Sequence, residues 1–210
     1  MVKADKQMEA ASYKETYQTI IKTAQRLFME LGYRSVSTRQ IAQICGVTQP
    51  AIYHHFKNKQ TLYVAVIQQT LHHTELDLKA ILGKFSTFQE RLTQIAFYMM
   101  IHFEMDLVQM FHDISHELGP DNQQLIHQWW IEGFFMPIVT MINDGIINEE
   151  IKNPESLNTN STELAYLILN VIKANLQPET TAALTQEERK IMAEKKVKLM
   201  VAIFINGIRG

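Results

Sequence analysis

Between residues 38 and 59 the sequence gathers side chains that can bond to phosphates and to the edges of base pairs. Arg, Lys, Thr and Tyr side chains bond phosphate oxygens, a Gln amide can pair with adenine, and an Ala methyl group can pack on the methyl group of thymine. The candidates are Thr38, Arg39, Thr48, Gln49, Ala51, Tyr53, His54, His55, Lys57 and Lys59. These residue types in one short stretch favour binding to double-stranded DNA.

A second group with chemical potential lies in the segment His112–Glu117. His112 and His116 are four residues apart, a spacing at which two imidazoles on one helical face can share a metal ion, with His102 as a third ligand. The His-Glu-x-x-His order of zinc hydrolases is absent. A helical metal-dependent enzyme is therefore the alternative to a DNA-binding protein. Our interpretation assigns no metal, no cofactor and no catalytic residue.

The elements that must position the DNA-binding candidates are two short helices. Ser37 is a typical residue to begin the first helix, Gly46 can adopt the left-handed conformation that ends it, and Thr48 can begin the second. This pattern predicts a helix-turn-helix over about residues 37–56. An ordinary helical hairpin inside a core has the same spacing and is the alternative.

Apolar residues recur at helical spacing along the rest of the chain, and glycine and proline are sparse, at eight and five residues. Ser12 and Glu15 have the spacing of a capping box and predict the start of the first helix, which Gly32 ends. Further helices are expected at about 58–82, 86–103, 107–118, 121–144, 161–176 and 186–207, with a kink near Gly133 and Pro137. The fold class is all-α, with about nine helices.

Charge is distributed unevenly along the chain. Residues 1–63 carry nine Lys or Arg against four acids, residues 64–151 carry three against twelve, and residues 152–210 carry eight against six. A basic N-terminal third suggests an anion-binding module attached to a part with another role. We expect a DNA-binding three-helix domain at 1–63 and a larger helical domain at 64–210. The acids of the middle region, Asp113 and Glu117 among them, are expected mostly on a solvated face. The alternative is that one or two are buried beside aromatic residues and favour a cationic ligand.

A longer pattern surrounds the helix-turn-helix. It comprises Ala24, Leu27, Phe28, Gly32 and Tyr33, then Ser37, Thr38, Arg39, Ile41, Ala42, Gly46 and Val47, and finally Ile52, Tyr53, Phe56, Lys59 and Leu62. Over residues 20–65 the chain thereby resembles the TetR family of transcriptional regulators. The resemblance implies that Thr38 and Arg39 bond phosphates, that Thr48, Tyr53 and Lys59 fix the register, and that Gln49 and Ala51 contact bases. It also implies a homodimeric repressor that a small molecule releases from a near-palindromic operator.

Ten aromatic residues and six methionines lie between Phe85 and Met141. Methionine suits adaptable binding surfaces, so this cluster predicts an effector pocket, with plain hydrophobic core as the alternative. The candidate pocket residues are Phe103, Met110, Phe111, His112, His116, Trp130 and Phe134. Because this region is strongly acidic, the expected effector is lipophilic and cationic or neutral.

The last two expected helices carry more apolar residues than one buried face requires, which predicts a subunit interface, with intramolecular core as the alternative. The interface candidates are Leu164, Leu167, Ile168, Val171, Val197, Met200, Val201 and Phe204. The single cysteine, Cys45, excludes a disulfide framework. The start of the chain is polar and no apolar run reaches the roughly 18 residues needed to span a membrane, so we expect a cytoplasmic protein.

Overall fold

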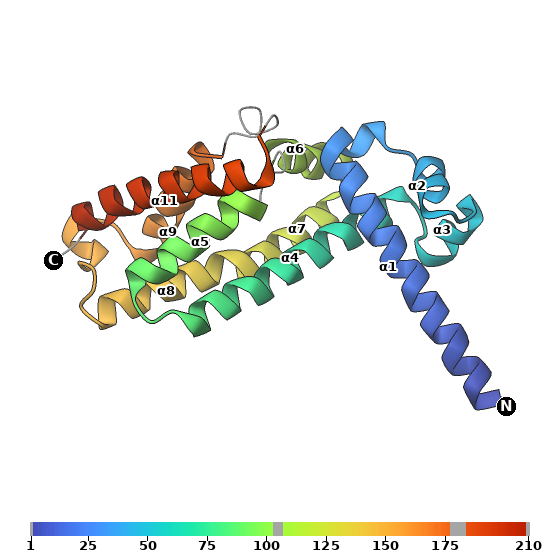
Figure 1. Ribbon diagram of the computed structural model, residues 1–210, viewed down its shortest axis with the longest axis horizontal. Helices are drawn as coiled ribbons and strands as arrows, with labels where there is room; N and C mark the ends of the chain where they lie inside the picture. Colours follow the sequence, from blue (N-terminus) through green and yellow to red (C-terminus); the bar gives the residue numbers. More distant parts are fainter. Residues whose placement is uncertain (1, 103–106, 177–183, 209–210) are drawn as a thin grey trace. The chain divides into compact units, whose positions relative to one another are not determined.

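The computed structural model describes residues 2–102, 107–176 and 184–208, and the regular structure in these ranges is helical throughout (Figure 1). The contacts divide the chain into two compact units. The first comprises Met1–Thr70 and Leu107–His127, and the second comprises Leu71–Asp106 and Gln128–Gly210. The predicted all-α class is confirmed.

The first unit contains the two short helices that the sequence predicts. Its helices are α1 (Val2–Ser35), α2 (Thr38–Cys45), α3 (Gln49–His55), the first part of α4 (Lys59–Lys84), α6 (Leu107–Glu117) and most of α7 (Pro120–Trp130). Apolar side chains from α1 to α4 form its core, namely Ile20, Ala24, Leu27, Phe28, Ile41, Ile52, Phe56, Leu62, Val66 and Ile67. This core fixes how α3 crosses α2.

The ends of the short helices are set by local hydrogen bonds. The Ser37 hydroxyl accepts the Gln40 N–H at 3.1 Å, and the Thr48 hydroxyl accepts the Ala51 N–H at 3.3 Å. Gly46, at φ 69° and ψ 24°, is left-handed and ends α2. The three end signals predicted from the sequence are confirmed, because each acts within three residues of itself.

Helix α1 departs from the expectation at its start. It begins at Val2, so Ser12 lies inside the helix and the predicted N-cap there is wrong. Residues 2–11 are rich in Ala, Lys, Glu, Gln and Met, which have high helix propensity and extend the helix past a capping signal. Gly32, at φ 77°, interrupts the helical geometry near the other end, where the sequence places the stop.

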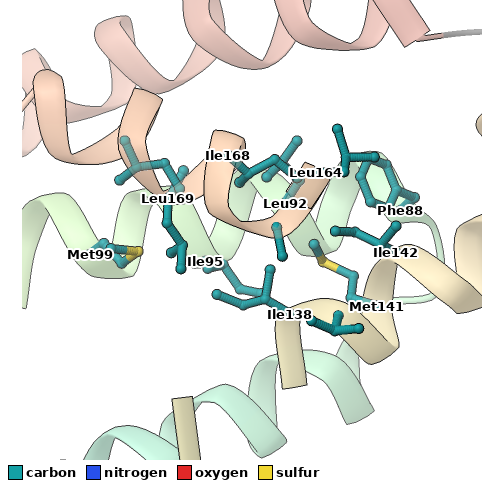
Figure 2. Close-up of a cluster of buried hydrophobic side chains, with 14 of the residues drawn as sticks. Phe88, Leu92, Ile95, Met99, Ile138, Met141, Ile142, Leu164, Ile168 and Leu169 are labelled. Carbon is teal, nitrogen blue, oxygen red and sulfur yellow. The ribbon is translucent and has the colours of Figure 1, made fainter. Parts of the chain in front are cut away.

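The second unit has one continuous apolar core. It is built from the second part of α4, from α5 (Phe88–His102), from α8 (Met136–Ile147), from α9 (Ser161–Ala174) and from α11 (Gln186–Ile208). Figure 2 shows the centre of this core, where α5, α8 and α9 meet through Phe88, Leu92, Ile95, Met99, Ile138, Met141, Ile142, Leu164, Ile168 and Leu169. A short 3₁₀ helix, η2 (Pro154–Leu157), lies in the loop between α8 and α9.

At the place where the sequence predicts a kink, the backbone forms a π-helical turn, η1 (Ile131–Phe135), between α7 and α8. A Cβ atom on Gly133 would lie 3.3 Å from the Cβ of Glu75 on α4, so glycine permits the close approach. The whole segment Pro120–Ile147 is long and apolar enough to cross a membrane by length and composition. Phe134, Ile138 and Ile142 are nevertheless buried in the protein core, as in a core helix.

Candidate nucleic-acid interface

The hydroxyl of Thr38 joins α2 to α3. It lies 3.1 Å from the Tyr53 hydroxyl and accepts a hydrogen bond from Nε2 of Gln49 at 3.0 Å. The side chain itself is buried, at 6% exposure. Thr38 thus contacts the first residue of α3 and Tyr53 in its last turn. Its hydroxyl bonds to groups inside the protein and does not face solvent. Its predicted phosphate contact remains a prediction.

The other predicted DNA-binding residues line the surface around α3. Arg39, Thr48, Tyr53, His54 and Lys57 are exposed, and Gln49, Ala51, His55 and Lys59 are half-buried. Tyr53, at 47% exposure, points its hydroxyl at Thr38 and leaves much of its ring accessible. Hydrogen-bonding groups and cations therefore share one accessible face around a short, capped helix, as reading a major groove requires.

Lys59 is held by an aromatic ring. Its Nζ lies 4.1 Å from the centroid of the Tyr33 ring. Burial lowers the pKa of the Lys59 ammonium group, while the nearby carboxylates of Glu117 and Asp113 act in the opposite direction. A cation over an aromatic face is attracted by the negative face of the ring, so this lysine is kept at the start of α4.

Two acids of α6, Asp113 and Glu117, bond to α1 and α4 instead of facing solvent. Asp113 is 3% exposed, and its Oδ2 accepts the backbone N–H of Tyr33 at 2.9 Å. The Oε1 of Glu117 lies 2.5 Å from Nε of Arg34, and the Glu117 carbonyl accepts from the Gln60 amide at 2.9 Å. These two residues follow the alternative of burial. The sequence could not single them out because their hydrogen-bonding partners lie about 57 to 83 residues away, beyond any local pattern.

Two tyrosines of α1 pack on the end of α3, and sequence reasoning missed both. The ring of Tyr13 lies 4.1 Å from the ring of His55 and 5.8 Å from that of His54, between ring centroids. Tyr17 stacks on Phe56 at 5.0 Å. The spacing of four residues between the tyrosines was the available signal, since it places them on one face of a helix.

The predicted effector residues fall in both units. Phe103 lies outside the described residues. In the first unit Met110 is half-buried, Phe111 is exposed, and the rings of His112 and His116 stack at 4.1 Å. In the second unit Trp130 lies 6.0 Å from Phe134, which is buried.

A separate pocket of about 380 Å³ lies between α5 and α11 in the second unit and contains none of the predicted effector residues. Its lining residues are Thr93, Gln94, Phe97, Glu194, Val197 and Lys198.

The metal-ligand geometry of His112 and His116 is weak. Nδ1 of His116 lies 2.8 Å from the carbonyl oxygen of His112 in the preceding turn, and the stacked rings face each other. Across the described ranges no three His, Cys, Asp or Glu side chains come together as a metal site would need.

The predicted interface residues divide into two groups. Leu164, Ile168, Val197 and Val201 are buried in the chain's own core. Val171, Met200 and Phe204 are half-buried, and Leu167 is 53% exposed. Leu199 and Ile203, which the sequence reading left out, are 64% and 66% exposed on α11. Periodicity identified apolar helices here but could not tell which face the chain covers itself.

The capped pair α2 and α3, with its polar and basic exposed face, defines a helix-turn-helix DNA-binding protein. The family described as "Bacterial regulatory proteins, tetR family" matches residues 20–66. The HTH-type transcriptional regulator TtgW of Pseudomonas putida is 32% identical over 123 residues, which cover 59% of this chain and 89% of that protein. The chain belongs to the TetR family of transcriptional regulators.

Other similarities cover different shares of the chain. The TetC protein of transposon Tn10 from Escherichia coli is 42% identical over 67 residues, and the match covers 32% of this chain and about a third (34%) of TetC. The regulator FadR of Bacillus subtilis, solved with stearoyl-CoA, superposes with a TM-score of 0.67 at 18% identity, covering 88% of this chain and 97% of FadR. AibR, solved with isovaleryl-CoA and operator DNA, gives 0.63 at 20% identity, covering 85% and 96%.

The Thr38 hydroxyl gives the first prediction. Thr38→Val keeps the side-chain shape but leaves the Tyr53 hydroxyl and the Gln49 amide without this partner. We expect the free energy of unfolding to fall by about 1–2 kcal/mol, because water can replace only part of the lost bonding at these sites. Denaturant unfolding measures the change. Thr38→Ser is the matched control and should stay near wild type. Equal stability of the Val and Ser variants would contradict the role assigned to the hydroxyl.

Proposed function

We propose that this regulator is a repressor that binds a near-palindromic operator as a homodimer and leaves it when a lipophilic effector binds. The observation that carries the proposal is the accessible face of α3, whose backbone is fixed by Thr48 at its start and by Thr38 against α2. A recognition helix held in this way can present several side chains to a major groove at once.

Within this proposal the residues of the DNA-binding set divide by role. Gln49 and Ala51, in the first turn of α3, read base edges. Arg39, Thr48, Tyr53, Lys57 and Lys59 bond phosphates and set the register, with Thr38 close behind them. His54 and His55 lie at the far end of α3. The surplus of five positive charges in residues 1–63 supports the attraction to DNA.

The proposed effector site lies in the second unit, around the π-helical turn. There Trp130 stacks on Phe135 at 5.2 Å, and Phe135 lies 4.4 Å from Tyr166. FadR and AibR are solved with acyl-CoA molecules, which combine an apolar chain with an anionic headgroup. The acidic surplus of residues 64–151 in this chain instead favours a lipophilic cation or neutral compound over an anion. Apolar burial would supply most of the affinity.

Within the first unit, α6 is bonded to the helices on either side of the helix-turn-helix, and we assign to it the part that responds to the effector. Asp113 and Glu117 bind Tyr33, Arg34 and Gln60. If the effector favours another position of α6, these bonds change, and the two recognition helices no longer match two half-sites. The effector can shift this equilibrium only by its difference in affinity for the two states.

The proposed dimer interface uses the exposed apolar residues of α9 and α11. Leu167 on α9 and Leu199 and Ile203 on α11 would lie in a bundle across a two-fold axis. The residues that the chain already buries support the interface from beneath. The same proposal makes the protein a cytoplasmic regulator and not an enzyme.

The experiment that tests the proposed function is selection of bound sequences from random duplex DNA, followed by affinity measurements over a range of salt. We expect one near-palindromic sequence and an affinity that falls steeply as salt rises. Gln49→Ala should cost about 1–3 kcal/mol at one base pair and relax the preference there. Lys57→Ala, the matched control, should weaken all sequences about equally. Equal behaviour of the two variants would remove Gln49 from sequence recognition.

The neighbouring residues Leu167 and Ile168 test the proposed dimer. Leu167→Asp places a charge on an exposed side chain and should give folded monomers with weaker operator binding. Ile168→Asp places the same charge at a side chain of 2% exposure and should unfold the second unit, because an unpaired buried charge is costly. Sedimentation and circular dichroism separate the results. A dimeric Leu167→Asp protein, or a wild-type monomer at micromolar concentration, would contradict the proposed interface.

A thermal-shift panel tests the effector. It compares lipophilic cations, neutral aromatic compounds and acyl-CoA molecules, and each stabilising compound is then tested for release of operator DNA. We expect release by a cation or neutral compound, and a weaker effect of the same compound on Trp130→Ala. The Phe97→Ala variant, in the pocket between α5 and α11, is the control. Stabilisation and release by anions alone would show that the charge argument is wrong.

A further inference from the structure

Helix α1 carries an aromatic pair on the face that meets the recognition helix. Tyr17 lies about one turn, and Tyr13 about two turns, before Ile20 and Ile21, the first fully buried residues among the side chains described from residue 11 onward. In Figure 1 this part of α1 runs past α2 and α3 toward the N-terminus. The stretch around Tyr13 is therefore held by few core contacts of its own, and its position relative to α3 depends on the two tyrosine rings.

The two tyrosines have different surroundings. Tyr17 stacks on Phe56, which is 3% exposed, at an interplanar angle of 30°, and thus extends the core. Tyr13 is 46% exposed. Its ring lies 4.1 Å from His55 at an angle of 41°, and 5.8 Å from His54 in an edge-to-face arrangement at 84°. Tyr13 consequently covers two side chains that belong to the DNA-facing surface.

The imidazole of His55 is enclosed by this arrangement. Its Nδ1 is buried and has no hydrogen-bond partner among the described residues. Burial lowers the pKa of His55, and the neighbouring His54 lowers it further. The titratable groups that face it are His54 on α3 and Tyr13 and Tyr17 on α1. A proton on Nδ1 would be a buried donor without an acceptor, so the neutral ring with its proton on Nε2 is favoured.

We propose that Tyr13, which lies outside the helix-turn-helix, is a specificity-determining residue that fixes the side-chain conformations of His54 and His55 against DNA. The proposal rests on the function proposed above. A neutral, immobilised imidazole can discriminate between hydrogen-bonding partners, whereas a mobile, protonated one is attracted to the phosphates of any sequence. Tyr13 thereby favours the operator over other DNA without touching a base itself.

The test compares Tyr13→Ala with Tyr13→Phe, which keeps the ring, and with Ser12→Ala as a matched exposed control. Affinities are measured for the selected operator and for random duplex DNA, at about pH 6 and about pH 8, where an ordinary histidine changes charge. We expect Tyr13→Ala to lower the ratio of operator to random affinity about tenfold, the size expected when one base-reading side chain loses its geometry. Its random-DNA binding should also strengthen more at low pH than that of the wild type. Tyr13→Phe and Ser12→Ala should match the wild type.

Proton NMR titration of the histidines, without DNA, gives an independent measurement. The His55 resonance should titrate at a higher pH in Tyr13→Ala than in the wild type or in Tyr13→Phe, because water then reaches the ring. An unchanged His55 titration overturns the proposal, whatever happens to DNA binding. So does a Tyr13→Ala variant that weakens operator and random DNA equally, since that is the result of a merely structural role. Failure of the wild type to select any sequence would instead refute the proposed function. The titration would still test whether the Tyr13 ring holds His55 in its neutral form.

Discussion

A buried carboxylate on α6 ties this helix to the end of α1. Asp113 is removed from water, and a carboxylate in that position is stable only with hydrogen-bond donors around it. One donor is the backbone N–H of Tyr33, just after the interruption of α1 at Gly32. A backbone donor cannot be replaced by a change of rotamer, so α6 remains tied to the end of α1. Glu117, one turn further on, adds Arg34 and Gln60 to the same link.

This link explains why α6 groups with the DNA-binding helices although nearly forty residues of the chain separate it from them. It also places negative charge close to Lys59, which sits over the ring of Tyr33. The α6 carboxylates attract the Lys59 ammonium group, and a phosphate approaching α4 would compete with them for it. A change in α6 would alter both the backbone near Tyr33 and the electrostatic surroundings of this lysine.

The sequence predicted the helix-turn-helix well because its signals are local. Ser37, Gly46 and Thr48 each act on backbone groups within a few residues, so their roles can be read without tertiary information. Local signals fail where a stronger local preference competes, as at Ser12, which the helix-forming residues before it override. Sequence reading also assigned the outward face of α3 but not the contacts that fix it. Thr38 belongs inside, bonded to Tyr53 and Gln49, because α2 crosses α3 at that point.

The remaining differences concern surfaces that periodicity cannot distinguish. An apolar residue at helical spacing can face its own core or another molecule, and the sequence pattern is the same in both cases. Ile168 and Leu167 are neighbours on α9, yet one is 2% and the other 53% exposed. Only the packing of α9 against α5 and α8 separates them (Figure 2). The same holds for α1, where Tyr17 completes a core while Tyr13, one turn away, covers two histidines of the DNA-facing helix. Exposed surface and core therefore share a single helix in both units, and a substitution on either helix must be chosen by exposure rather than by residue type.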